Sequence, residues 1–161
     1  MKLGFNCAVS TQDQANFNVL SGSLAEIKAY RGSHGVLPTT QGANLAARNN
    51  HMDILKYLHK HGVDADSMGA IVAAEKGYLE VVRFLMSVGV GMFRVSDAAL
   101  SCGREDIVDM LSATCHIVPS RRGLIMAKKN RHDAVAERVA RKYDLPVPSV
   151  LPRTNVVFSE W

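Results

Sequence analysis

Five segments of the chain repeat one pattern of apolar and polar positions. Each is built around a small or amide residue, here termed the anchor. The anchors are Gly22, Asn50, Gly77, Gly103 and Asn130, at spacings of 28, 27, 26 and 27 residues. An apolar residue stands three positions before and five positions after every anchor, and the positions four and eight after it are apolar except at Glu26 and Arg138. Offsets of four, five and eight share one face of a helix, so the pattern predicts an amphipathic helix after each anchor.

These five helices are predicted over residues 23–30, 51–61, 78–88, 105–114 and 132–142. A shorter helix is predicted before each anchor. Alanines line it in the central units, at Ala43, Ala46, Ala47, Ala70, Ala73, Ala74, Ala98 and Ala99. Small side chains let neighbouring helices approach closely. Gly62 and Gly89 stand where a left-handed residue would end two of the longer helices.

The predicted fold is an all-α solenoid of about five stacked helix-turn-helix units, with no room for a paired strand between them. A unit this small buries its apolar stripe only by stacking on its neighbours. The repeat domain covers 1–144, with units at about 12–35, 39–65, 67–91, 94–116 and 120–143. The tail 145–161 holds three of the five prolines and the only Trp. It either folds back as a cap, docks elsewhere as a linear motif, or has no role.

Charge is concentrated at one end of the chain. The whole sequence of 161 residues carries 19 − 15 = +4, whereas 116–144 alone carries eight basic and three acidic residues, or +5. A basic patch is predicted at Arg121, Arg122, Lys128, Lys129 and Arg131. Such a patch attracts nucleic acid, an acidic protein surface or an anionic membrane, or it is ordinary solvated surface.

Composition excludes several classes of protein. With 47% apolar residues but no run of 18, the chain is expected to be globular without a membrane span. No apolar run follows the N-terminus, so no secretory signal is predicted. Three cysteines, Cys7, Cys102 and Cys115, form neither a disulfide framework nor a CxxC pair. An intracellular location, cytoplasmic or nuclear, is therefore expected.

No catalytic or cofactor motif is found. Phosphate loops, dinucleotide fingerprints and metalloprotease or hydrolase motifs are all missing from the sequence. His59 and His61 lie about 200° apart around a helix, so they cannot share a metal. Cys102, close to Arg104, is either a somewhat reactive thiol or an inert one. The expectation is a protein that is not an enzyme, with no metal and no cofactor.

Three stretches resemble a known repeat. Residues 46–62 read AARNNHMDILKYLHKHG, 73–85 read AAEKGYLEVVRFL, and a weaker copy at 100–111 reads LSCGREDIVDML. These resemble the ankyrin repeat, and the resemblance covers about 12–143. The spacing is shorter than the usual 33 or so residues, and the tetrapeptide that opens the family's first helix is missing. The short period looks like divergent arrays of giant viruses, amoebae and oomycetes, which have trimmed β-hairpin fingers; a viral protein would act in its host cell.

The resemblance implies a non-catalytic, monomeric scaffold that binds a protein partner on its concave surface. In the family, contacts often come from the two residues before each anchor. Carried over, these are Arg48, Asn49, Glu75, Lys76, Ser101, Cys102, Lys128 and Lys129. The alternative is binding of nucleic acid or an acidic surface through the basic patch, with phosphate contacts that weaken steeply with salt. A third possibility is a decayed gene copy without a partner.

Overall fold

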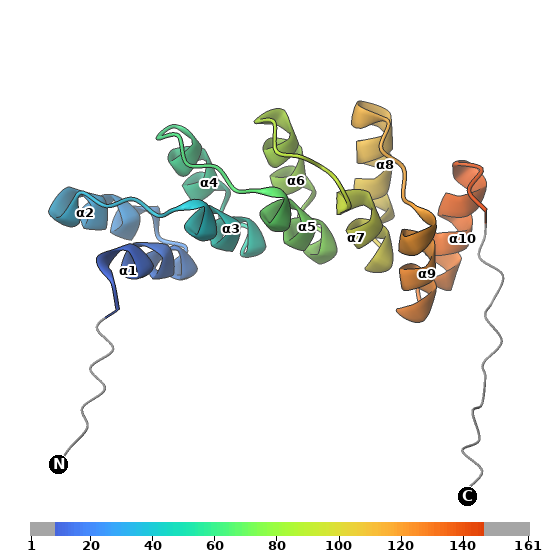
Figure 1. Cartoon of the computed structure of the whole chain (residues 1–161), viewed down its shortest axis with the longest axis horizontal. Helices are drawn as coiled ribbons and strands as arrows, with labels where there is room; N and C mark the ends of the chain where they lie inside the picture. Colours follow the sequence, from blue (N-terminus) through green and yellow to red (C-terminus); the bar gives the residue numbers. More distant parts are fainter. Residues whose placement is uncertain (1–8, 147–161) are drawn as a thin grey trace, which may run out of the picture.

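The computed structural model describes residues 9–146, which form ten α-helices and one short 3-10 helix (Figure 1). The helices are α1 (Thr11–Phe17), η1 (Asn18–Ser21), α2 (Leu24–His34), α3 (Thr40–Arg48), α4 (Met52–His59), α5 (Ser67–Lys76), α6 (Leu79–Ser87), α7 (Val95–Ser101), α8 (Glu105–Cys115), α9 (Arg121–Lys129) and α10 (Asp133–Lys142). Residues 9–146 contain no β-strand. The all-α stack of helix pairs, without a projecting hairpin in this range, is confirmed. The tail prediction falls almost wholly on 147–161, outside the described residues. Cys7, near the N-terminus, also lies outside them.

The helices form two rows. Odd-numbered helices pack closely on one another along the stack and form the inner row, whereas the even-numbered helices make few contacts among themselves. Figure 1 shows α4, α6 and α8 standing side by side above α3, α5 and α7. Buried alanines such as Ala46 and Ala73 allow the close approach within the inner row. The larger side chains of the outer helices hold that row apart, so the stack curves with the inner helices on its concave side.

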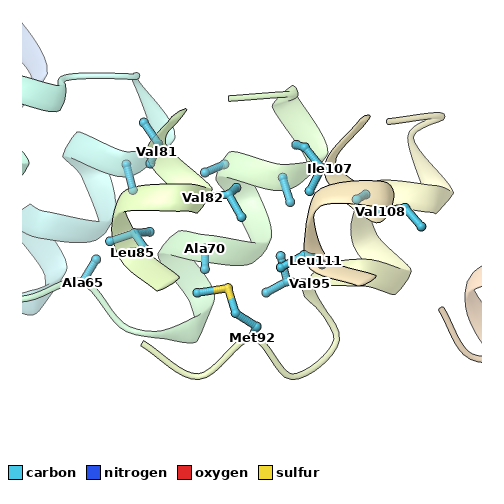
Figure 2. Packing of buried hydrophobic residues seen from close by; sticks show 14 of the residues in the cluster. Ala65, Ala70, Val81, Val82, Leu85, Met92, Val95, Ile107, Val108 and Leu111 are labelled. Carbon is cyan, nitrogen blue, oxygen red and sulfur yellow. The ribbon is translucent and has the colours of Figure 1, made fainter. Parts of the chain in front are cut away.

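One elongated core runs between the rows. Its largest members are aliphatic side chains of the outer helices, among them Leu58, Leu85 and Leu111, which recur eight positions after an anchor. Figure 2 shows these layers in the central units, with Met92 extending from the loop before α7 to lie close to Ala70. Each unit thus buries its apolar stripe mainly against its own partner helix and its neighbours.

The anchors adopt the left-handed conformation that ends each inner helix. Gly77 and Gly103 have φ of 83° and 71°, and Asn50 has φ of 60°. In the last unit the prediction is wrong by one residue, because Asn130 has φ of −85° and Arg131 has φ of 65°. The hydrogen bond from His132 N to Ala127 O (2.8 Å) repeats the one from Arg104 N to Ala99 O (2.8 Å), which fixes the anchor at Arg131.

This shift changes the reading of the last helix. Counted from Arg131, the positions five and eight after the anchor are Ala136 and Val139, both buried. Arg138 therefore does not interrupt the apolar stripe; it lies on the exposed surface of α10. The two residues before this anchor are Lys129 and Asn130 rather than Lys128 and Lys129.

Some helix ends also differ from the predicted ones. Helix α2 continues past the predicted end at residue 30 to His34, and Gly35, with φ of 69°, ends it. Gly32 is accommodated inside α2, so it is no helix breaker here. Helices α4 and α6 end at His59 and Ser87, earlier than predicted, and left-handed Gly62 and Gly89 follow after a short turn.

A polar clamp joins three pairs of adjacent units. The side chain six positions before one anchor accepts a hydrogen bond from the backbone at the start of the next inner helix: Asn16 Oδ1 from Thr39 N (2.8 Å), Asn44 Oδ1 from Asp66 N (3.0 Å), and Asp97 Oδ1 from Ser120 N (2.6 Å). A glycine of the next helix, Gly42, Gly69 or Gly123, leaves room for it, because a Cβ there would meet the clamp oxygen at 2.5–2.8 Å.

The joint between the third and fourth units is different. Ile71 and Val95 take the places of the clamp residue and the glycine, and Met92 stands where the other units have Thr39, Asp66 or Ser120. Val95 is fully buried and Met92 is only 6% exposed. This joint therefore uses apolar packing instead of a hydrogen bond to the backbone.

Candidate protein-binding surface

The exposed side of the inner helices carries a continuous apolar stripe. It consists of the residues five positions before each anchor, termed here the inner stripe: Phe17, Leu45, Val72, Ala98 and Met126. Phe17 and Met126 are exposed, and the other three are half-buried. Two mostly polar rows accompany the stripe: the residues nine positions before the anchors are polar except Met68, and those two positions before the anchors are polar except Leu20. The concave surface thus has an apolar centre with polar edges, an arrangement common in protein interfaces.

The sequence contains this signal, but the reasoning from sequence passed over it. Every unit has an apolar residue five positions before its anchor, yet the short helices were read mainly as lined by small residues. The family resemblance points instead to the residue pairs before the anchors.

The surface is hollowed at its C-terminal end. A cavity of about 150 Å³ lies between α5, α7 and α9, lined by Ile71, Ala98, Met126 and charged residues. A second cavity, of about 480 Å³, lies between the loop before α7 and the segment before α9, and Phe93, Ile117 and Val118 line it. Arg94, Asp97 and Arg122 line both cavities, which we call together the α7–α9 groove.

Two arginines in this groove are left available. Within residues 9–146, the structure gives neither Arg94 nor Arg122 an ion pair or a side-chain hydrogen bond. Asp97, the acidic side chain that lines both cavities, is engaged by Ser120, which donates from its backbone N and its Oγ (both 2.6 Å). Arg94 also holds the left-handed conformation, with φ of 66°, at the start of α7. The larger cavity therefore presents two arginines and one engaged carboxylate beside apolar side chains, whereas Glu75 adds a second carboxylate to the smaller cavity.

Only four of the eight predicted contact residues form one row. Arg48, Glu75, Ser101 and Lys129 form the row two positions before the anchors, and Glu75 and Ser101 also line the smaller cavity. In two of the pairs the second residue turns to its own unit: Asn49 Nδ2 donates to Leu45 O (3.0 Å), and the Lys76 ammonium lies 5.9 Å from the Tyr78 ring centre.

Two further predicted contacts lie elsewhere. Cys102 is half-buried, with its Sγ 3.8 Å from Ser101 Oγ. Lys128, one residue out of the structural register, is half-buried and does not belong to the row.

The predicted basic patch is split between the ends of α9. Arg121 and Arg122 lie in its first turn, whereas Lys128 and Lys129 lie in its last turn and Arg131 follows it. One end is thus separated from the other by about 10 Å of helix. The patch does not extend onto α10, whose basic side chains pair with acidic ones.

Helices α8 and α10 are linked by a charged cluster. Arg138 Nη2 lies 2.7 Å from Glu105 Oε2, and Lys142 Nζ lies 2.8 Å from Asp109 Oδ2. Tyr143 donates a hydrogen bond from its hydroxyl to Asp109 Oδ1 (2.8 Å). Partial burial alone would raise the pKa of Asp109, but the hydrogen bonds from Lys142 and Tyr143 outweigh it, so that the pKa is lowered overall.

This cluster predicts an acid-sensitive contribution to stability. Because the folded pKa of Asp109 lies below its unfolded value of about 3.9, its contribution is present above about pH 4 and is lost as the pH falls through the folded pKa. Asp109→Asn should lower the free energy of unfolding at neutral pH by up to about 1 kcal/mol, the limit for exposed pairs. Below about pH 4, it should lose less stability than the wild type.

Urea unfolding at neutral pH and at about pH 3 measures both effects. Glu137→Gln is the control, since its partner Arg141 is 3.6 Å away on an exposed face. Glu137→Gln should lose as much free energy of unfolding as the wild type between neutral pH and about pH 3. Equal acid dependence of Asp109→Asn and the wild type would contradict the assignment.

The histidines have structural contacts. His51 and His132 pack against Gly22 and Gly103 of the preceding unit, where a Cβ would lie 2.6 and 2.8 Å from the nearest ring atom. Further out, His59 Nδ1 lies 2.6 Å from Asp64 Oδ1, and His61 Nδ1 lies 2.8 Å from Tyr57 O. No group of three His, Cys, Asp or Glu side chains suited to a metal occurs in residues 9–146. Nor does this range hold a helix long and apolar enough to cross a membrane.

The fold defines a stack of ankyrin-like helix pairs, and comparison with known proteins agrees with it. Residues 44–69 match the ankyrin repeat family. The match begins within α3, covers α4 and ends at the start of α5, so it includes the clamp between Asn44 and Asp66. No curated protein matches the chain. The family typically consists of non-catalytic domains that bind other proteins.

Proposed function

We propose that the chain is a non-catalytic intracellular scaffold that binds a partner protein along the concave face of its inner helices. The observation that carries the proposal is the inner stripe, which leaves apolar side chains in solvent at the centre of one face in all five units. Apolar area gathered in this way lowers the free energy of association when a partner covers it. The ankyrin repeat match over 44–69 supports the same class of function.

The partner is proposed to contact the row Arg48, Glu75, Ser101 and Lys129, which borders the stripe. Of the eight residues that the family resemblance implies, we assign these four to the binding face, whereas Asn49, Lys76, Cys102 and Lys128 fall outside this row. Binding is proposed to involve a single copy of the chain, with all five units contributing one continuous surface.

The test is affinity capture from cell lysate with the full chain as bait, followed by titration of the captured protein. Arg48→Glu combined with Lys129→Glu should weaken binding by about tenfold or more, because both side chains are exposed and reversed charge opposes a complementary partner. The matched control reverses two exposed charges of the outer helices, Lys56→Glu and Arg83→Glu, and should leave affinity unchanged.

Equal affinity of the two double variants would contradict binding on the inner face. Nuclease treatment of the lysate distinguishes binding of a protein from the alternative, binding of nucleic acid. Capture that disappears with nuclease would favour nucleic-acid binding through Arg121, Arg122, Lys128, Lys129 and Arg131.

A further inference from the structure

We infer that the α7–α9 groove binds an acidic peptide segment of the partner protein, in which one large apolar side chain enters the groove and flanking carboxylates pair with Arg94 and Arg122. This inference rests on the proposed function and names the chemistry of the partner. It places the strongest contact at the start of α7 and α9; of the residue pairs before the anchors, only Glu75 and Ser101 line the groove.

The apolar component comes from side chains that the fold leaves in solvent. Phe93 is 81% exposed, and Val118 and Met126 are 42% and 38% exposed. Phe93 directly follows Met92, whose side chain is 6% exposed and packs into the core, so the loop that presents Phe93 is tied to the stack. A side chain that enters between Phe93 and Val118 would remove apolar surface on both sides from water.

The charged component comes from the two arginines. Both line each of the two cavities, so any occupant of the groove passes beside them. Guanidinium groups bind carboxylates with two parallel hydrogen bonds, and no acidic side chain within 9–146 forms an ion pair with either arginine. Arg121 is exposed next to Arg122 and adds positive charge at this end. In the larger cavity the two arginines outnumber the one carboxylate, Asp97, which Ser120 already engages, so charge complementarity there selects an acidic occupant.

The lining favours a peptide over a nucleic acid. Bases of single-stranded nucleic acid stack on aromatic faces, and Phe93 is the only aromatic side chain among the residues that line the groove. Ile71, Ile117, Val118 and Met126 are aliphatic instead, which suits a Leu, Ile, Met or Phe side chain. The inner stripe continues from Met126 through Ala98 and gives the rest of an extended segment an apolar path.

The probe is a library of random linear peptides displayed on phage and selected against the full chain. Enriched peptides should combine Asp or Glu residues with one large apolar residue. Their affinity, measured by fluorescence anisotropy at physiological salt, should fall at least about tenfold for Arg122→Glu and for Arg94→Gly. Both variants should fold, since glutamate is favourable in the first turn of α9 and glycine readily adopts the φ of 66° found at Arg94.

Arg83→Glu on the outer helix α6 is the control, because it makes the same change in net charge as Arg122→Glu and should leave affinity unchanged. Replacing the apolar residue of the selected peptide by serine should also abolish binding. A peptide that binds equally without that residue, or an oligonucleotide that binds the groove as tightly, would overturn the inference and show a general anion surface.

Two other outcomes separate this inference from the proposed function. Peptides that lose affinity with Arg48→Glu and Lys129→Glu but not with Arg122→Glu would overturn the groove assignment while supporting the inner face. Failure to enrich any peptide would overturn the groove assignment. The capture experiment would then decide separately whether the chain is a protein-binding scaffold. If peptides bind only after Phe158→Ser and Trp161→Ser, the occupant is the chain's own C-terminal segment and the inference is wrong.

Discussion

Leu85→Ala should lower the free energy of unfolding by about 2–5 kcal/mol, as expected for truncation of a fully buried leucine. Leu85 is 1% exposed and lies in α6, within the third of the five units. Truncation removes apolar contacts and leaves a cavity, because the surrounding helices collapse only in part. Since each unit contacts only its neighbours, a defect at the middle unit also weakens the coupling between the two ends.

Urea unfolding followed by far-UV circular dichroism measures this effect. Besides the lower midpoint, we expect a shallower transition, since the two ends of the stack then unfold less cooperatively. Met68→Ala is the control: Met68 is 60% exposed in α5, and its loss should change stability by no more than about 0.5 kcal/mol. A loss below about 1 kcal/mol for Leu85→Ala would mean that α6 is not part of a shared core.

The same substitution at two helical glycines should have opposite effects. Gly32→Ala should raise stability by about 0.5–1 kcal/mol, because alanine is the better helix former and nothing lies within 4 Å of its added Cβ. Gly69→Ala should lower stability by about 1–2 kcal/mol, since its Cβ would lie 2.5 Å from Asn44 Oδ1 and 3.1 Å from Ala65 Cβ.

The loss at Gly69 arises in the polar clamp. To make room, the Asn44 side chain must move away from Asp66, and both hydrogen bonds between them (3.0 Å each) are lost or lengthened. Thermal and urea unfolding of the two variants measures the difference. Stabilisation by both substitutions would show that the second and third units do not rely on the clamp.

Much of the fold could be predicted from the sequence because its signal is repeated. The apolar positions after Asn50, Gly77 and Gly103 recur with the same offsets, so five helix pairs followed from one pattern. The register of the last unit did not follow. An anchor defined as a small or amide residue falls on Asn130, whereas the backbone places the left-handed conformation at Arg131. The closer resemblance to viral and amoebal arrays stays a prediction.

The candidate surface was less accessible from the sequence. The row that includes Arg48 and Glu75 follows from the period and the resemblance. The α7–α9 groove does not, because Phe93 and Val118 belong to connecting segments of different units, outside the periodic positions. The clamps were likewise missed: their Asn or Asp residues recur six positions before the anchors and their glycines eight, but nothing in this spacing shows that the side chain of one unit bonds to the backbone of the next.

The polar clamps make the order of the units matter. Two units fit together in one of two ways. Either the glycine of the second unit packs against the Asn or Asp of the unit before it, or both positions are apolar, as Ile71 and Val95 are. A duplicate of the second unit inserted after the third would place Ile71 opposite Gly42 and leave the backbone N–H of Thr39 without the acceptor that Asn16 now provides. Gene duplication or shuffling would therefore preserve the stack only where matching joints meet, so adjacent units are expected to be inherited together.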